Sequence, residues 1–111
     1  MLARKYRLFK EEDYKQAYKK GKFFSTPYFN IKYSPNCLGH ARLGIVVSKR
    51  TLPKAVDRNK QKRRVRAIWG KNWQETVKKY DIIILIKHGC VSATEEQLQT
   101  AIKRFLHEKV L

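Results

Sequence analysis

The sequence predicts a single α/β domain whose elements follow the order α-β-β-α-β-α, with room for a short extra strand near Phe23. Two observations support this prediction. Segments with the apolar pattern of strands alternate with segments that have helical spacing. The chain has 111 residues, of which 42% are hydrophobic, so it can bury a core. Because no repeat, low-complexity tract or linker interrupts it, we expect residues 1–111 to form one domain.

A first helix is expected from the charges of residues 11–20. Acidic residues lie at Glu11–Asp13 and basic residues at Lys19–Lys20, which complements the helix dipole, and Gly21 suits the position after the helix end. Tyr14 and Tyr18 are spaced i and i+4, so they should lie on one side of this helix.

Three strands are expected. Within residues 23–33, apolar and polar side chains alternate, which is typical of a half-buried strand, and a turn follows in residues 34–40. Residues 42–48 alternate in the same way. Residues 80–87 form a continuous β-branched run, which indicates a strand covered on both faces.

Two further helices are expected. Thr51 and Pro53 favour a helix start, and the helix should continue to the region of Trp69 and Gly70. One stripe of this helix is apolar and comprises Gln61, Val65, Ile68 and Trp69. Residues 94–97 (Thr-Glu-Glu-Gln) match a capping box and should begin the last helix. Residues 42–87 then form a strand-helix-strand crossover, and the general rule for such units predicts a right-handed connection.

Positive charge is concentrated in one segment. Residues 49–66 contain nine of the 26 lysines and arginines and a single acid, Asp57, in a chain of net charge +17. Repulsion among so many like charges destabilises the compact state, and a bound polyanion relieves this repulsion. Counterions that the polyanion releases on binding add to the affinity. The segment therefore predicts binding to nucleic acid. By helical geometry Arg58 falls near the apolar edge, so its side chain should reach over the first turns of the helix.

Several other classes of function are disfavoured. The longest apolar run, Ile82–Ile86, is far too short to span a bilayer, and no secretion signal begins the chain. We therefore expect a cytoplasmic protein that does not bind membranes and whose Cys37 and Cys90 are reduced thiols. Cysteines and histidines (His40, His88 and His107) lack metal-ligand spacing, so no zinc site is predicted.

The nine acidic residues do not suggest a nuclease site. Most of them lie in the opening turns of predicted helices, where capping and the helix dipole explain them. Two-metal nucleases need clustered carboxylates. A site assembled only in three dimensions would escape this pattern, so a protein-only nuclease stays an alternative.

Four segments of the chain, in order and spacing, resemble the protein subunit of bacterial ribonuclease P. They are KYRLFKEEDYKQAYKKG, LGHARLGIVVSKR, KAVDRNKQKRRVRAIW and YDIIILIKHG. The third segment is the most specific, and the resemblance extends from Arg4 to about Phe105.

The resemblance implies a two-layer α/β sandwich with a mixed sheet of about four strands, three helices and a left-handed crossover, a fold also found in a ribosomal protein domain. It implies a protein that binds a catalytic RNA, about one to one, and the 5′ leader of precursor tRNA, and assists removal of that leader. The RNA would carry the chemistry with Mg²⁺. The protein would supply neither a catalytic residue nor a metal ligand, and it would need no protein partner.

The resemblance also assigns residues. The contacts to the catalytic RNA would come from Lys49, Arg50, Arg58, Asn59, Lys62, Arg63 and Arg66. Arginine forks and amides suit phosphates and base edges. The alternative is a solvated helix face at Lys60, Lys62, Arg63 and Arg66, helix-start residues at Arg58 and Asn59, and strand-ending charges at Lys49 and Arg50.

A cleft for the leader would be lined by Tyr14, Tyr18, Asn30 and Lys32. Bases stack on aromatic rings whatever their sequence, which suits a variable leader. The alternative is that Tyr14 and Tyr18 only pack the first helix on the sheet. The chain departs from the family at two points. Lys32 and Ile82 stand where some relatives carry further tyrosines, and Asp57 places an acid beside Arg58.

A basic ribosomal or ribosome-assembly protein is the second alternative, because composition alone fits it equally well. RNA that copurifies with the protein would distinguish the two: one structured RNA of a few hundred nucleotides, or ribosomal RNA.

Overall fold

The computed structural model describes residues 11–36, 40–72 and 80–110. Predictions for the first ten residues and for Cys37 lie outside this part. In chain order the elements are α1 (Glu11–Lys20), β1 (Lys22–Ser25), β2 (Phe29–Pro35), β3 (Arg42–Val46), α2 (Ala55–Asn72), β4 (Tyr80–Ile86), α3 (Gly89–Ser92), α4 (Glu95–Phe105) and a π-helix (Leu106–Val110).

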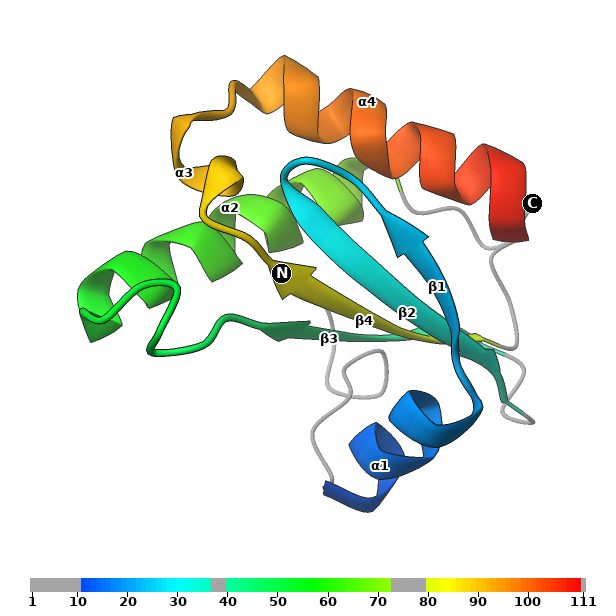
Figure 1. The fold of residues 1–111 in the computed structure, drawn as a ribbon. Helices are drawn as coiled ribbons and strands as arrows, with labels where there is room; N and C mark the ends of the chain where they lie inside the picture. The colour runs from blue at the N-terminus through cyan, green and yellow to red at the C-terminus, as the bar shows by residue number, and fades with distance from the viewer. Residues whose placement is uncertain (1–10, 37–39, 73–79, 111) are drawn as a thin grey trace.

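The strands form one mixed sheet in the order β1-β2-β4-β3 (Figure 1). β1 pairs with β2 and β2 with β4 in antiparallel fashion, whereas β3 and β4 are parallel. The predicted extended segment 23–33 is thus two strands, because a turn at Thr26 divides it. The Thr26 hydroxyl accepts a hydrogen bond from the Phe29 amide at 3.0 Å and donates one to the Phe29 carbonyl at 2.6 Å.

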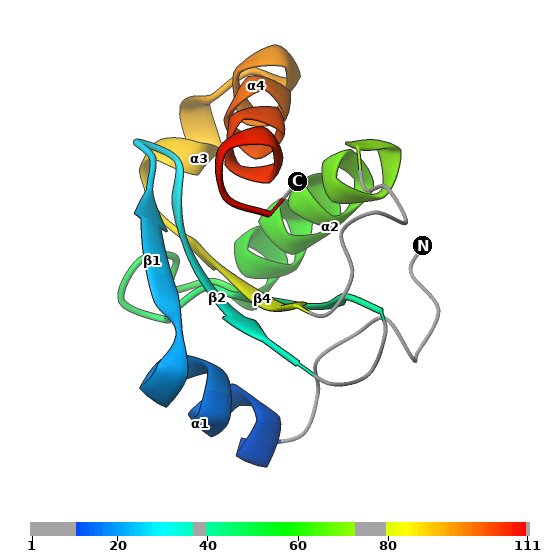
Figure 2. The ribbon, with the colours of Figure 1, turned by 90° about the vertical axis from the view of Figure 1, so that its right-hand side faces the viewer.

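Helices cover both faces of the sheet (Figure 2). α2 and α4 lie on one face and enclose the main core with the apolar side chains of the strands, and α1 lies on the other face. β4, which is central, is buried along most of its length, as the continuous apolar run predicts. The mixed four-stranded sheet with a helical layer confirms the predicted fold class.

The crossover from β3 through α2 to β4 is left-handed, as Figures 1 and 2 together show. The right-handed connection expected from the general rule is therefore wrong, and the left-handed one implied by the family resemblance is confirmed. With this strand order, a right-handed connection would place α2 on the face that α1 covers. Residues 47–54 separate β3 from α2, so the strand does not feed directly into the helix as the rule assumes.

The helix ends agree in part with the sequence predictions. The Thr94 hydroxyl accepts from the Gln97 amide at 3.1 Å, and the Gln97 side chain accepts from the Thr94 amide at 2.9 Å, so the capping box is present. α2 begins at Ala55, later than Thr51 and Pro53 suggested. The one-turn α3 and the π-helix were not predicted, since neither is long enough to show a periodic pattern.

Arg64 joins α2 to α3. Its guanidinium donates to the carbonyl oxygens of Cys90 (2.9 Å) and Ala93 and to the Gln61 side chain (2.9 Å). This arginine is therefore an internal crosslink and not part of the solvent-facing charge of α2. Burial raises the pKa of the neighbouring Cys90 thiol, which keeps it protonated at neutral pH.

Candidate nucleic-acid interface

The four residues predicted for a leader cleft lie on α1 and on the sheet face beneath it. Strand register places Lys32 opposite Ile83, and Ile83 opposite Gly44. The next row toward the ends of β3 and β4 contains Asn30, Leu85 and Val46. Lys32 and Asn30 therefore lie on one face, away from the main core, as the alternation in β2 predicts.

Tyr14 is seated over β3 at Gly44. A methyl group built on Gly44 would collide with the Tyr14 hydroxyl and come within 2.7 Å of its ring carbon Cζ. A glycine at this position thus allows the ring to lie directly on the strand. Burial raises the pKa of Tyr14, with a smaller contribution from Tyr18, so its hydroxyl carries no charge at neutral pH.

Tyr18 lies one turn further along α1 and is 38% exposed. The Lys32 ammonium is 5.2 Å from the centre of its ring and donates to the Tyr18 carbonyl at 3.2 Å. The two tyrosines therefore differ: Tyr14 is half-buried against the sheet, whereas Tyr18 offers ring surface beside a cation.

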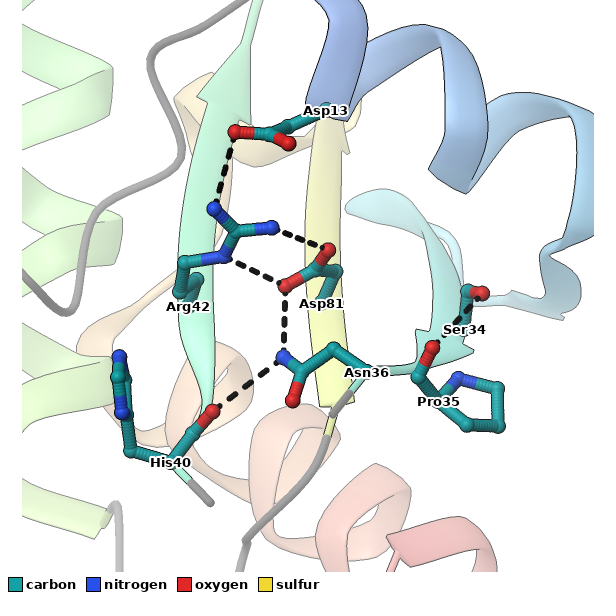
Figure 3. Close-up of polar contacts among 7 residues, drawn as sticks. All are labelled: Asp13, Ser34, Pro35, Asn36, His40, Arg42 and Asp81. Carbon is teal, nitrogen blue, oxygen red and sulfur yellow. Dashed lines mark hydrogen bonds and ion pairs between the residues drawn. The ribbon is translucent and has the colours of Figure 1, made fainter. Parts of the chain in front are cut away.

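An ion network fixes the start of α1 to the sheet (Figure 3). Arg42 on β3 donates to both carboxylate oxygens of Asp81 on β4, at 2.8 and 2.7 Å, and to Asp13 on α1 at 2.9 Å. The Asn36 side chain also donates to Asp81 at 2.8 Å. The hydrogen bond with Asp81 is the main cause of the raised pKa of Arg42. Because Asp13 precedes Tyr14, the network also fixes the position of Tyr14.

A groove of ≈ 510 Å³ opens beyond the tyrosines, where β3 and β4 end. Asn30 and Arg50 are among its lining residues, and Lys49 lies beside Arg50. Lys87, which was not among the residues predicted from the sequence, also lines it and donates to the Thr26 carbonyl at 2.8 Å. Its only sequence signal was a lysine at the end of the predicted strand 80–87. We call the groove, together with Tyr14, Tyr18 and Lys32, the cleft.

The second predicted surface, on α2, is cationic and open. Asn59 and Arg63 are exposed, and Lys62 and Arg66 are half-buried. Within the described ranges, no ion pair involves a basic side chain of α2. These charges are therefore not neutralised by described acids. We call Asn59, Lys62, Arg63 and Arg66 the basic helix face.

Arg58 reaches back over the start of α2, as helical geometry predicts. Its Nη1 donates to the carbonyl oxygens of Leu52 and Pro53 at 2.9 and 2.7 Å. This anchors the segment after β3 that carries Lys49 and Arg50. Arg58 therefore has an internal role whether or not the rest of its guanidinium contacts RNA.

The cleft and the basic helix face are neighbours although they lie on opposite faces of the sheet. The positive charge of Arg66 acts on Tyr14 and lowers its pKa, against the larger effect of burial. β3 is an edge strand of the sheet. Arg66 of the basic helix face is therefore close enough to Tyr14 of the cleft for its charge to act on the hydroxyl.

Among the described residues, no group of three His, Cys, Asp or Glu side chains could hold a metal ion. Asp13 and Asp81 do come together, but Arg42 lies between them and pairs with both. In the same part of the chain, no helix is long and apolar enough to cross a membrane.

Comparisons with known proteins point to one family. The family model described as Ribonuclease P matches residues 2–110. The Ribonuclease P protein component of Aliivibrio fischeri is 32% identical over 106 residues, which cover 96% of this chain and 90% of that protein. The structure of the Staphylococcus aureus RNase P protein matches with a TM-score of 0.80 and 32% identity, and the match covers 95% of this chain and 96% of that chain. A second structure from that organism, an RNase P protein mutant with defective mRNA degradation activity, matches with a TM-score of 0.79 and 31% identity over 93% of this chain and 86% of that chain.

Proposed function

The chain belongs to the ribonuclease P protein family, and we propose that it binds the catalytic RNA through the basic helix face and the 5′ leader of precursor tRNA through the cleft. The observation that carries this proposal is the presence of two different surfaces on opposite faces of one sheet. One offers cations without described acidic partners, and the other offers tyrosine rings beside a groove. The first suits a structured RNA and the second suits a single strand.

The basic helix face supports RNA binding by its charge and its shape. Lys62, Arg63 and Arg66 project from one rigid helix, so binding requires little ordering of the backbone. Neutralising RNA phosphates with these cations releases counterions, which provides affinity without sequence specificity. Lys49 and Arg50, held in place through Arg58, extend the same contact toward the cleft.

The cleft supports leader binding by a different chemistry. A tyrosine hydroxyl is uncharged at neutral pH, and burial raises the pKa of both Tyr14 and Tyr18 further, so these hydroxyls do not repel phosphates. Base stacking on an aromatic ring contributes about 1–3 kcal/mol per base and tolerates any sequence. Lys32 and Arg50 offer cations for the backbone of the same strand.

Catalysis is proposed to belong to the RNA, with Mg²⁺ ions that the RNA holds. The described protein residues do not fit a magnesium site, since the two carboxylates that meet, Asp13 and Asp81, already share Arg42. The protein would act by binding: it would hold the leader and the catalytic RNA in one complex, about one to one and in the cytoplasm, without a further protein partner. The RNA that copurifies with the protein tests this against the ribosomal alternative.

The first prediction concerns catalysis. Purified protein without RNA should not cut precursor tRNA at the mature 5′ end, whereas the RNA alone should cut weakly at high Mg²⁺. Adding the protein should restore cleavage at low Mg²⁺, because it raises affinity for the substrate. Cleavage rates over a Mg²⁺ series measure this.

Because a mutant of the Staphylococcus aureus RNase P protein has defective mRNA degradation activity, the assay should include an unstructured mRNA as a second substrate. Metal-dependent cleavage by RNA-free protein at the mature tRNA end would overturn the proposal that catalysis belongs to the RNA and not to the protein.

The second prediction concerns the tyrosines. A Tyr14→Ala, Tyr18→Ala protein should still assemble with the catalytic RNA, but its affinity for precursor tRNA with a leader of several nucleotides should fall by about 1–3 kcal/mol for each base that no longer stacks. Affinity for mature tRNA, which has no leader, should not change. Binding of both substrates and the melting curve should be measured on one preparation.

Gly44→Ala is a matched variant that leaves both rings in the protein. The added methyl group should displace the Tyr14 ring from β3 and weaken leader binding in the same direction. If Tyr14 and Tyr18 only pack α1 onto the sheet, the double variant should instead melt earlier and bind both substrates equally poorly, because loss of a buried aromatic costs about 3–5 kcal/mol.

A further inference from the structure

The largest exposed aromatic surface in the described part of the chain belongs to a residue that the proposed sites do not use. Phe23 on β1 is 54% exposed, compared with 38% for Tyr18, which is the other exposed aromatic side chain there. Its neighbour Phe24 packs on the core, with its ring centre 5.4 Å from that of Phe105. The two phenylalanines therefore point to opposite faces of the sheet.

Strand register puts Phe23 on the cleft side. It is paired with Lys32 in the antiparallel ladder between β1 and β2, so the two side chains share a face. Lys32 in turn contacts Tyr18 through its ammonium group. Lys32 is thus the common neighbour of Tyr18 and Phe23, and a cation lies beside two exposed rings.

Packing does not account for this ring. An exposed phenylalanine on a four-residue edge strand adds little to the core, and Lys22 beside it is also exposed. Rings interleaved with cations on an open sheet face are typical of surfaces that bind single-stranded nucleic acid. The charge of the whole chain, +17, favours the same kind of partner.

We infer that Phe23 is an additional base-stacking residue, which extends the cleft past Lys32 to the β1 edge of the sheet. Its ligand is an unpaired nucleotide of the precursor tRNA leader. This inference rests on the proposed function. It places an aromatic ring next to Lys32.

The test uses the complex of protein and catalytic RNA, with precursor tRNAs whose leaders increase in length. Phe23→Ala should lower affinity for precursors with long leaders by about five- to tenfold, the lower part of the range for one stacked base. Short-leader precursors and mature tRNA should bind as before, because no nucleotide reaches β1. The melting temperature should not change, since the side chain is exposed.

Two substitutions separate stacking from simple burial. Phe23→Leu keeps apolar area but no aromatic face, so it should behave like Phe23→Ala, whereas Phe23→Trp should restore binding. Val91→Ala removes an exposed apolar side chain from α3, outside the cleft, and should have no effect on either substrate. Full affinity in Phe23→Leu would overturn the inference.

The remaining outcomes also decide the question. If Phe23→Ala leaves the long-leader preference intact while the tyrosine double variant loses it, Phe23 is not part of the cleft and the proposed function stands. If the unsubstituted protein shows no preference for leaders at all, the proposed function itself is wrong. A free protein that dimerises and becomes monomeric on Phe23→Ala would assign the ring to an interface between copies and overturn the inference.

Discussion

A protein with Lys62, Arg63 and Arg66 replaced by glutamine should bind the catalytic RNA about a hundredfold more weakly at physiological salt. Removal of one phosphate contact should lower the slope of log affinity against log salt by about 0.7–0.9, so removal of three should lower it by about 2–3. Arg58 is left unchanged because it holds the Leu52 and Pro53 carbonyls, and its loss would disturb the neighbouring segment. Equilibrium binding over a salt series measures both quantities.

A charge-matched control distinguishes a specific binding face from net charge. Lys103, Arg104 and Lys109 are exposed near the end of the chain, and replacing them by glutamine removes the same charge from another surface. If the two triple variants change the slope equally, the basic helix face has no special role. An unchanged slope in the α2 variant, with an intact fold, would mean that this face is only solvated.

Features with a local pattern could be predicted from the sequence. The capping box at Thr94 and Gln97 needs only two side chains three residues apart, and the structure contains it. The apolar run of β4 indicates burial on both faces in any fold. The outward direction of Asn30 and Lys32 follows from alternation in β2 alone. Each of these depends on neighbours in the chain.

Features that depend on strand register could not be predicted. Gly44 accommodates Tyr14 because the ring reaches β3 from α1, which itself packs over β2 and β4, and the sequence does not indicate which strand the ring meets. Phe23 lies on the cleft side of the sheet because it pairs with Lys32 rather than with a neighbouring residue. A shift of one residue in register would turn Phe23 to the opposite face, and in β3 it would bring Leu43 or Ile45 to the place of Gly44.

The charge pattern of α2 predicted a binding face but not its exceptions. Arg64 and Arg63 are adjacent and chemically identical, yet only Arg64 donates to the carbonyls of Cys90 and Ala93. Its partners lie on or just after α3, a helix too short to show a pattern. A count of basic residues therefore overstates the charge that this helix offers to RNA.

Loss of the Asp81 carboxylate should have the largest effect on stability. Asp81 and Arg42 are only 10% and 18% exposed, so Asp81→Ala leaves a largely buried guanidinium with Asp13 as its remaining partner. Removing one member of a buried pair costs about 3–5 kcal/mol. We expect a value near the lower limit, because Asp13 still contacts Arg42. Urea unfolding measures it.

The reason for this cost can itself be tested. If the unpaired charge is responsible, replacing both partners, as in Arg42→Met with Asp81→Leu, should recover most of the stability that Asp81→Ala removes. Asp13→Asn should cost less than Asp81→Ala, because Asp13 is more exposed and Arg42 keeps both bonds to Asp81. A double variant no more stable than Asp81→Ala would mean that the missing hydrogen bonds or packing, rather than an unpaired charge, cause the effect.

Stability and leader binding should be separable within this network. Asp13 joins α1 to Arg42 and directly precedes Tyr14, whereas Asp81 joins two strands. Asp13→Asn should therefore weaken binding of leader-bearing substrates more than it lowers the melting temperature, while Asp81→Ala should do the reverse. In a chain of net charge +17, each carboxylate removed also adds to self-repulsion. Added salt screens that general repulsion but not a buried pair, so a loss that persists in high salt identifies the network as its source.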